Sequence, residues 1–196
     1  MNNDLHLEHE NARRILEEGW TLFQLKGYRG VNIDELCRRC GLTKPTLYYY
    51  FQDKENLFVQ VLQYKLRGFH AVIERPGLLA ERLERVATSI LDSFQVQYIV
   101  LLRDREHLKR PENLEGIRHA FHQELFSPLI DLMQAGMAQG QLRGDNPETL
   151  ALIFLGIINN FIGKSAEMHL ANAALARMLC GFFLYGVMAQ SVGLSE

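Results

Sequence analysis

The chain has 196 residues, with 21 basic and 23 acidic side chains that give a formal net charge of -2. At 47% hydrophobic and 22% charged residues, its composition excludes a disordered chain and a collagen-like repeat. The near-neutral balance excludes binding to nucleic acid by bulk charge alone, and three cysteines are too few to staple a small secreted protein.

The first ten residues do not have the pattern of a signal peptide, since they carry Asp4, Glu8 and Glu10 and lack both a basic and an apolar segment. Two uncharged apolar stretches, 150–163 and 178–189, fall short of the roughly 20 residues that a membrane-spanning helix needs. We therefore expect a cytoplasmic protein that does not enter a membrane.

Helical periodicity runs through the sequence, and no run of alternating β-branched residues predicts a strand. We expect an all-α fold of about nine helices. The first helix carries an apolar stripe over residues 12–23, and Lys26-Gly27 ends it, because glycine is the usual residue just after a helix.

The next two helices are short and lie close together. Asn32, with Glu35 three residues later, predicts the N-cap of a helix over residues 33–40, in a variant of the capping box. Gly41 ends this helix, and Thr43 is a good N-cap for the next one. The pattern is helix, tight glycine turn, helix.

Longer helices follow. Asp53 predicts the N-cap of a fourth helix, and Pro76-Gly77 marks a connection. Beyond it, amphipathic segments predict further helices over 78–94, 95–107, 111–138, 147–164 and 171–191, with a loop over 139–146.

Residues 33–51 have the spacing of a helix-turn-helix, whose second helix enters the major groove of DNA. Leu47 and Phe51, four residues apart, anchor that second helix to a core. Its other side chains are hydroxyls, rings and a lysine, more than packing alone explains. Such groups contact phosphates and base edges.

Charge is concentrated at the same place. Residues 26–67 hold eight basic and four acidic side chains, a local net charge of +4, whereas residues 76–196 hold 10 basic and 13 acidic ones. A basic end on an acidic body orients a protein on DNA.

Several segments match one known family at the right spacings: Arg14-Ile15-Leu16, Leu22-Phe23, Lys26-Gly27-Tyr28, Ile33-Asp34-Glu35-Leu36, Gly41-Leu42-Thr43-Lys44-Pro45-Thr46-Leu47-Tyr48-Tyr49-Tyr50-Phe51 and Asp53-Lys54-Glu55-Asn56-Leu57. Through them, about the first third of the chain resembles the N-terminal domain of the TetR family of bacterial transcriptional regulators. Tyr50 departs from the pattern, because the family often has histidine there.

The resemblance implies a homodimer, usually a repressor, that binds a pseudo-palindromic operator in double-stranded DNA and is released when a small molecule occupies its C-terminal domain. It implies a helix-turn-helix domain over 1–52, a connecting helix over 53–75, and a ligand-binding and dimerisation domain over 76–196. By position, the DNA-binding residues are Asn32, Thr43, Lys44, Pro45, Thr46, Tyr48, Tyr49 and Lys54.

The helices over 147–164 and 171–191 are apolar on more than one face, so something must cover them. A partner subunit is the expected cover, because the family's dimer interface is built from its last two helices; a core within one chain is the alternative. The candidate interface residues are Phe154, Ile157, Ile158, Phe161, Leu175, Leu179, Phe182 and Phe183.

Ligand pockets are mostly apolar with a few polar groups, so aromatic, histidine and methionine side chains are the candidates for lining one. They are Phe94, Tyr98, His119, Phe121, His122, Phe126, Met133 and Met137. The same residue types at helical spacing also suit an ordinary core.

Two other functions compete with this one. Cys37 and Cys40 form a CxxC pair on one side of a helix, which suits a redox-responsive regulator, although cysteine also packs as a small buried hydrophobe. His119 and His122 have the spacing of metal ligands on a helix, as in a helical metal-binding enzyme, but the partner motifs are missing. With no nucleophile motif or phosphate loop, we expect no enzyme, cofactor or metal.

Overall fold

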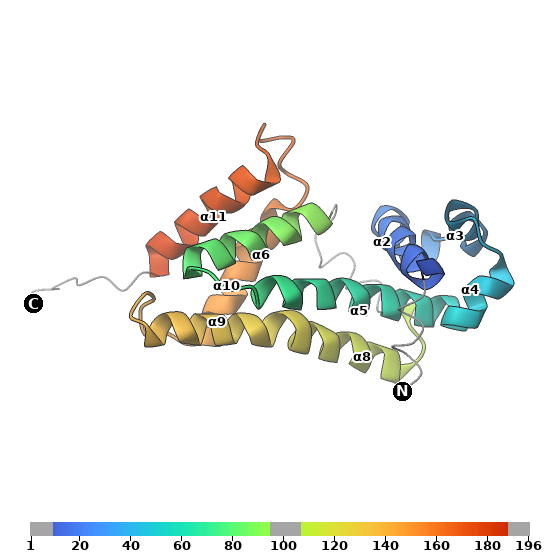
Figure 1. Cartoon of the computed structure of the whole chain (residues 1–196), viewed down its shortest axis with the longest axis horizontal. Coiled ribbons are helices and arrows are strands. Elements are labelled where there is room, and N and C mark those ends of the chain that lie inside the picture. The colour runs from blue at the N-terminus through green and yellow to red at the C-terminus, as the bar shows by residue number, and fades with distance from the viewer. Residues whose placement is uncertain (1–9, 95–106, 188–196) are drawn as a thin grey trace, which may run out of the picture. The chain divides into compact units, whose positions relative to one another are not determined.

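The computed structural model describes residues 10–94 and 107–187, and every secondary-structure element within these ranges is a helix (Figure 1). The all-α prediction is confirmed. Contacts divide the described residues into two compact units. One contains residues 10–68 and 107–121, and the other contains residues 69–94 and 122–187.

The first unit is built from five helices, one of which, α5, continues beyond it. In chain order they are α2 (Glu10–Gly30), α3 (Ile33–Cys40), α4 (Lys44–Phe51), α5 (Lys54–Ile73) and α8 (Pro111–Phe121). Gly27 breaks the helical backbone of α2 with φ +67, close to the end predicted from Lys26-Gly27. A side chain is disfavoured at this φ, so glycine suits the break.

Local capping sets the bounds of α3 and α4. Asn32 Oδ1 accepts a hydrogen bond from the N–H of Asp34 at 2.8 Å, and Thr43 Oγ1 accepts one from the N–H of Thr46 at 3.4 Å. Between the two helices Gly41 takes the left-handed conformation, with φ +64. The predicted helix-turn-helix and its N-caps Asn32 and Thr43 are confirmed, but Glu35 does not complete the predicted capping box, because its carboxylate binds Lys26 of α2 instead.

The core of the first unit follows the apolar stripes of the sequence. The rings of Phe23 on α2 and Phe58 on α5 meet edge to face, with centroids 4.9 Å apart. Leu47 and Phe51 of α4 are 0% and 1% exposed, as their four-residue spacing predicted. Each such side chain contributes roughly 1.5–3 kcal/mol by leaving water, which is enough to hold a short helix in place.

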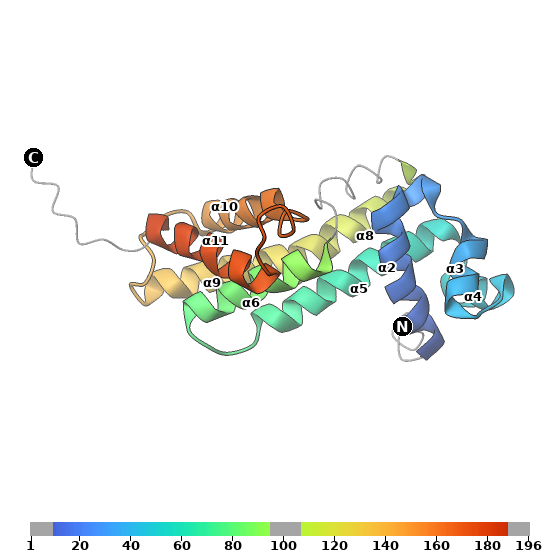
Figure 2. The ribbon, with the colours of Figure 1, turned by 90° about the horizontal axis from the view of Figure 1, so that it is seen from above.

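The second unit contains α6 (Leu79–Ser93), the π-helix η2 (His122–Phe126), α9 (Ser127–Ala138), α10 (Pro147–Phe161) and α11 (Asn172–Val187). Helix α11 packs along α6, and α10 packs on α9 (Figure 2).

Most of the predicted helices of this part are found, with small shifts at their ends. The loop over 139–146 lies between α9 and α10 as predicted, whereas the helix predicted over 111–138 is interrupted by η2. Most of the helix predicted over 95–107 lies outside the described residues. Within the described ranges no helix is both long and apolar enough to cross a membrane.

Candidate functional site

Helix α4, called the recognition helix below, turns its polar and aromatic residues outward. Tyr49 is 72% exposed and Tyr48 40%, and the rings of Tyr49 and Tyr50 meet edge to face with centroids 5.4 Å apart. Leu47 and Phe51 take up the buried side of the helix. Exposed aromatic rings on an eight-residue helix contribute little to the core, and such rings are typical of a surface that contacts a partner.

The N-terminus of the recognition helix carries a hydroxyl pair and a lysine. Oγ1 of Thr43 and Oγ1 of Thr46 lie 2.9 Å apart. Nζ of Lys44 lies 2.9 Å from Oδ1 of Asp34 on α3, and this hydrogen bond raises the pKa of Lys44. Both partners are largely exposed, and exposed ion pairs add little stability, so Lys44 can exchange the carboxylate for a phosphate.

Lys54 makes contacts that the sequence did not indicate. Its Nζ donates to the carbonyl oxygens of Val31 at 2.6 Å and Arg29 at 3.3 Å, and it lies 5.0 Å from the ring centroid of Tyr28. The lysine therefore joins the start of α5 to the end of α2.

The CxxC pair lies in the core of the first unit. Cys37 and Cys40 are both buried and free, and Sγ of Cys40 donates to the carbonyl oxygen of Arg14 at 3.8 Å. Burial, followed by the charge of Glu18, raises the pKa of Cys40 to about 11. Burial also raises the pKa of Cys37. Since the thiolate is the reactive form, these thiols react slowly at neutral pH, which disfavours the redox function.

The ligand candidates are scattered over several environments. His119 and His122 are exposed; Phe94, Phe121, Phe126 and Met137 are half-buried; Met133 is buried. Tyr98 lies outside the described residues. His122 meets Phe126 edge to face, and Phe94 stacks on Phe69. No group of three metal-binding side chains occurs among the described residues.

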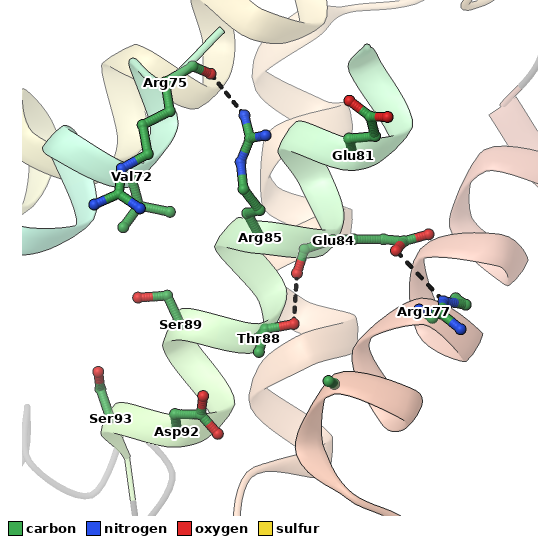
Figure 3. Close-up of a pocket in the computed structure, with 11 residues that line it drawn as sticks. Val72, Arg75, Glu81, Glu84, Arg85, Thr88, Ser89, Asp92, Ser93 and Arg177 are labelled. Atoms are coloured by element: carbon green, nitrogen blue, oxygen red, sulfur yellow. Dashed lines mark hydrogen bonds and ion pairs between the residues drawn. The ribbon is translucent and has the colours of Figure 1, made fainter. Parts of the chain in front are cut away.

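A groove of about 600 Å³ lies over the polar face of α6, between the end of α5 and α11 (Figure 3). Two arginines stand at one end. Nη2 of Arg85 donates to the carbonyl oxygens of Arg75 and Pro76 at 2.7 and 2.9 Å, while the Arg75 guanidinium is exposed and has no ion pair within the described residues. A row of hydroxyls follows along α6, from Thr88, Ser89 and Ser93.

The acidic side chains of this groove are already engaged. Glu84 pairs with Arg177 on α11 at 3.6 Å, Asp92 accepts from Asn172 at 2.8 Å, and Glu81 accepts from the N–H of Leu78 at 3.1 Å. The lining therefore holds three carboxylates and three guanidinium groups, of which that of Arg75 is exposed and makes no ion pair within the described residues. The groove was not predicted from the sequence, although Arg85, Ser89 and Ser93 recur every four residues and so mark a polar stripe.

The candidate interface residues on α10 and α11 fall into two groups. Five of them are covered by this chain itself: Phe154, Ile158, Leu175, Leu179 and Phe183. Ile157 and Phe161 are half-buried, and Phe182 is 70% exposed. Beside Phe182, the exposed large hydrophobic residues of the two helices are Leu152, Ile153 and Tyr185. We call these four side chains the apolar face.

Residues 15–61 match the family model described as bacterial regulatory proteins, tetR family. The uncharacterized HTH-type transcriptional regulator YdgC of Bacillus subtilis (strain 168) is 23% identical over 186 residues, which cover 91% of this chain and 93% of YdgC. IcaR, the HTH-type negative transcriptional regulator of the biofilm operon icaADBC in Staphylococcus aureus (strain Newman), is 21% identical over 122 residues, 62% of this chain and 63% of IcaR.

Among solved structures, AibR in complex with isovaleryl coenzyme A and operator DNA aligns with a TM-score of 0.67. The alignment covers 92% of this chain and 99% of AibR, at 22% sequence identity. At this level of identity the likeness shows a shared fold.

Proposed function

We propose, since the chain belongs to the TetR family of bacterial regulatory proteins, that this helix-turn-helix transcriptional regulator is a dimeric repressor with a pseudo-palindromic operator. The observation that carries the proposal is the recognition helix, which buries two anchors and exposes Tyr48 and Tyr49. Each subunit places this helix in the major groove of one half-site.

The contacts divide into two kinds. Lys44 and the hydroxyls of Thr43 and Thr46 lie at the N-terminus of the recognition helix, where they suit phosphates and the nearest base edges. The rings of Tyr48 and Tyr49 suit the methyl groups of thymines. Asn32 caps α3 and so sets the angle at which this helix meets the DNA backbone.

The apolar face supports the dimer. Four large apolar side chains exposed on two neighbouring helices are what a twofold interface would cover. Gly181 and Gly186 stand beside them, and an added Cβ at either position would meet nothing within 4 Å. A partner helix could therefore approach α11 closely, with Phe182 and Tyr185 of each subunit packed against the other.

We propose that the protein represses transcription, since its relative IcaR is a negative regulator. A protein that acts on bacterial DNA works in the cytoplasm. We propose no enzymatic activity.

Selection from a library of random duplexes tests the proposed function. The full-length protein is expected to enrich an inverted repeat whose half-sites are centred about 34–36 Å apart, or a multiple of this, because two recognition helices read successive major grooves. Footprinting on the enriched duplex should show two protected half-sites. Enrichment of no sequence, or of a single asymmetric site, would contradict the proposal.

The groove on α6 is our candidate for the effector site. Its exposed Arg75 and the hydroxyls of Ser89 and Ser93 suit one anionic group of a small molecule. AibR was solved with a coenzyme A thioester, which carries phosphates, so an acyl-coenzyme A is the first probe. The effector would favour a half-site spacing that no longer matches the operator.

Arg75→Ala tests this site. We expect the substitution to weaken binding of isovaleryl-coenzyme A at least tenfold in calorimetry, since the exposed guanidinium is the group best placed for a phosphate. Arg13→Ala is the control, because Arg13 pairs with Glu17 on an exposed face of the other unit. Equal affinities for the wild type and Arg75→Ala, or no binding by the wild type, would exclude this assignment of the groove.

A further inference from the structure

The first turn of α5 and the start of α8 are joined by one arginine. Asp53 caps α5 by accepting a hydrogen bond from the N–H of Asn56 at 2.9 Å. Its two carboxylate oxygens also accept from Nη2 of Arg110, at 2.7 and 2.9 Å. Nε of Arg110 lies 3.4 Å from Oε1 of Glu55. Arg110 immediately precedes α8, and its guanidinium binds both acidic side chains at the start of α5.

Glu55 in turn caps α8. Its carboxylate accepts hydrogen bonds from the N–H groups of Lys109 and Arg110, at 3.2 and 3.0 Å, and from Nδ2 of Asn113 at 2.9 Å. The N–H groups at a helix start have no partner within the helix and favour a negative charge. Glu55 of α5 therefore caps a helix that lies far away in sequence, while Arg110, just before that helix, holds the carboxylate that caps α5.

The pKa of the capping carboxylate, Glu55, depends on the groups that donate hydrogen bonds to it. Glu55 is only 8% exposed. Burial alone would raise the pKa of Glu55, but the hydrogen bonds from Asn113, Arg110 and Lys109, together with the charge of Arg110, lower it below the ordinary value for glutamate. The side chain stays ionised at neutral pH, and loss of the arginine would leave a buried charge with fewer partners.

Asp53 and Glu55 of this cluster come directly after the recognition helix in the chain, since that helix ends at Phe51. The joint is a tight turn in which Gln52 has φ +62 and ψ -52, and the N–H of Asp53 donates to the carbonyl oxygen of Phe51 at 2.6 Å. Lys54 then binds the carbonyl oxygens at the end of α2. Of the three residues after the turn, Asp53 and Glu55 are thus held by Arg110, and Lys54 is held by the end of α2.

We infer that Arg110, outside the helix-turn-helix, is a positioning residue for DNA binding: through Asp53 and Glu55 it fixes the corner from which the recognition helix projects. The inference rests on the proposed function.

The test compares specific with non-specific binding, using a duplex selected by the wild-type protein and an unrelated duplex of the same length. Arg110→Ala is expected to bind the selected duplex at least tenfold more weakly and the unrelated duplex within twofold of wild type. The reason is that the lysines and arginines facing phosphates are unchanged, whereas base contacts need the exact angle of the helix. Arg110→Lys should fall in between, because lysine keeps the charge but not the forked contact.

Arg118→Ala is the matched control, since Arg118 lies on α8, the helix that Arg110 precedes, and makes an exposed pair with Glu115. Its ratio of specific to non-specific affinity should equal that of wild type. All variants are compared below their melting temperatures; if Arg110→Ala does not fold, Asn113→Ala, which removes one hydrogen bond, should lower the ratio about threefold.

Three outcomes would overturn the inference. Arg110→Ala could bind the selected duplex like wild type, or both affinities could fall together, as expected for a residue that only stabilises the fold. If the wild type enriches no sequence at all, the proposed function fails and the inference falls with it.

Discussion

Replacing Tyr49 with alanine is expected to weaken binding to the selected operator by roughly 1–3 kcal/mol, that is about 5- to 150-fold, with little change in thermal stability. The ring is 72% exposed, so its loss leaves no cavity in the core, while a base contact in the major groove would be lost entirely. Fluorescence anisotropy with the selected duplex measures the affinity, and a thermal melt measures the stability.

The pattern of the loss distinguishes the two kinds of contact. Tyr49→Ala should relax preference at one base pair in each half-site, whereas Lys44→Ala should weaken binding to all sequences and reduce the salt dependence by about one phosphate contact per subunit. Leu25→Ala serves as the control, because Leu25 is 59% exposed in the same unit but lies on α2. Wild-type affinity in Tyr49→Ala would remove this tyrosine from the DNA-binding surface.

A charge on the apolar face is expected to separate the subunits. Phe182→Asp removes a ring that would be buried twice in a twofold interface, at roughly 1.5–3 kcal/mol for each copy, and places a carboxylate where water is excluded. The wild type should sediment as two chains of 22.6 kDa and the variant as one. Affinity for the selected operator should fall at least 100-fold, because each monomer then binds its half-site without help from a second subunit.

Leu78→Asp is the matched control for this experiment. Leu78 is 68% exposed in the same unit, on the connection before α6 rather than on α10 or α11. It should leave both the mass and the operator affinity unchanged. A wild type that sediments as a monomer at micromolar concentration, or a Phe182→Asp variant that remains dimeric, would show that the apolar face is not the dimer interface.

The sequence predicted the helix-turn-helix well because its signals are local. Asn32, Gly41 and Thr43 act within one turn of their own positions, and Leu47 and Phe51 are one helical turn apart. Nothing outside the segment is needed to decide such features.

Features that depend on distant partners could not be predicted in this way. Asp53 and Arg110 are 57 positions apart, and neither residue type signals the other. The periodicity of the apolar residues on α10 and α11 showed that these residues must be buried. It did not show whether this chain or a partner subunit buries them. The structure assigns Phe154 and Phe183 to the chain's own core, and it leaves Phe182 exposed.

The π-helix η2 has a consequence for how the helical segment 111–138 is phased. The buried stripe of α8 passes through Ile117, and a regular α-helix would carry it on, in steps of seven, to Glu124 and Asp131. The wider turn delays the stripe by one residue, so that it falls on Leu125 and Leu132, and Asp131 stays in water. In effect the segment contains one supernumerary residue, and the π-turn absorbs it where a strict helix would have brought a carboxylate into the core.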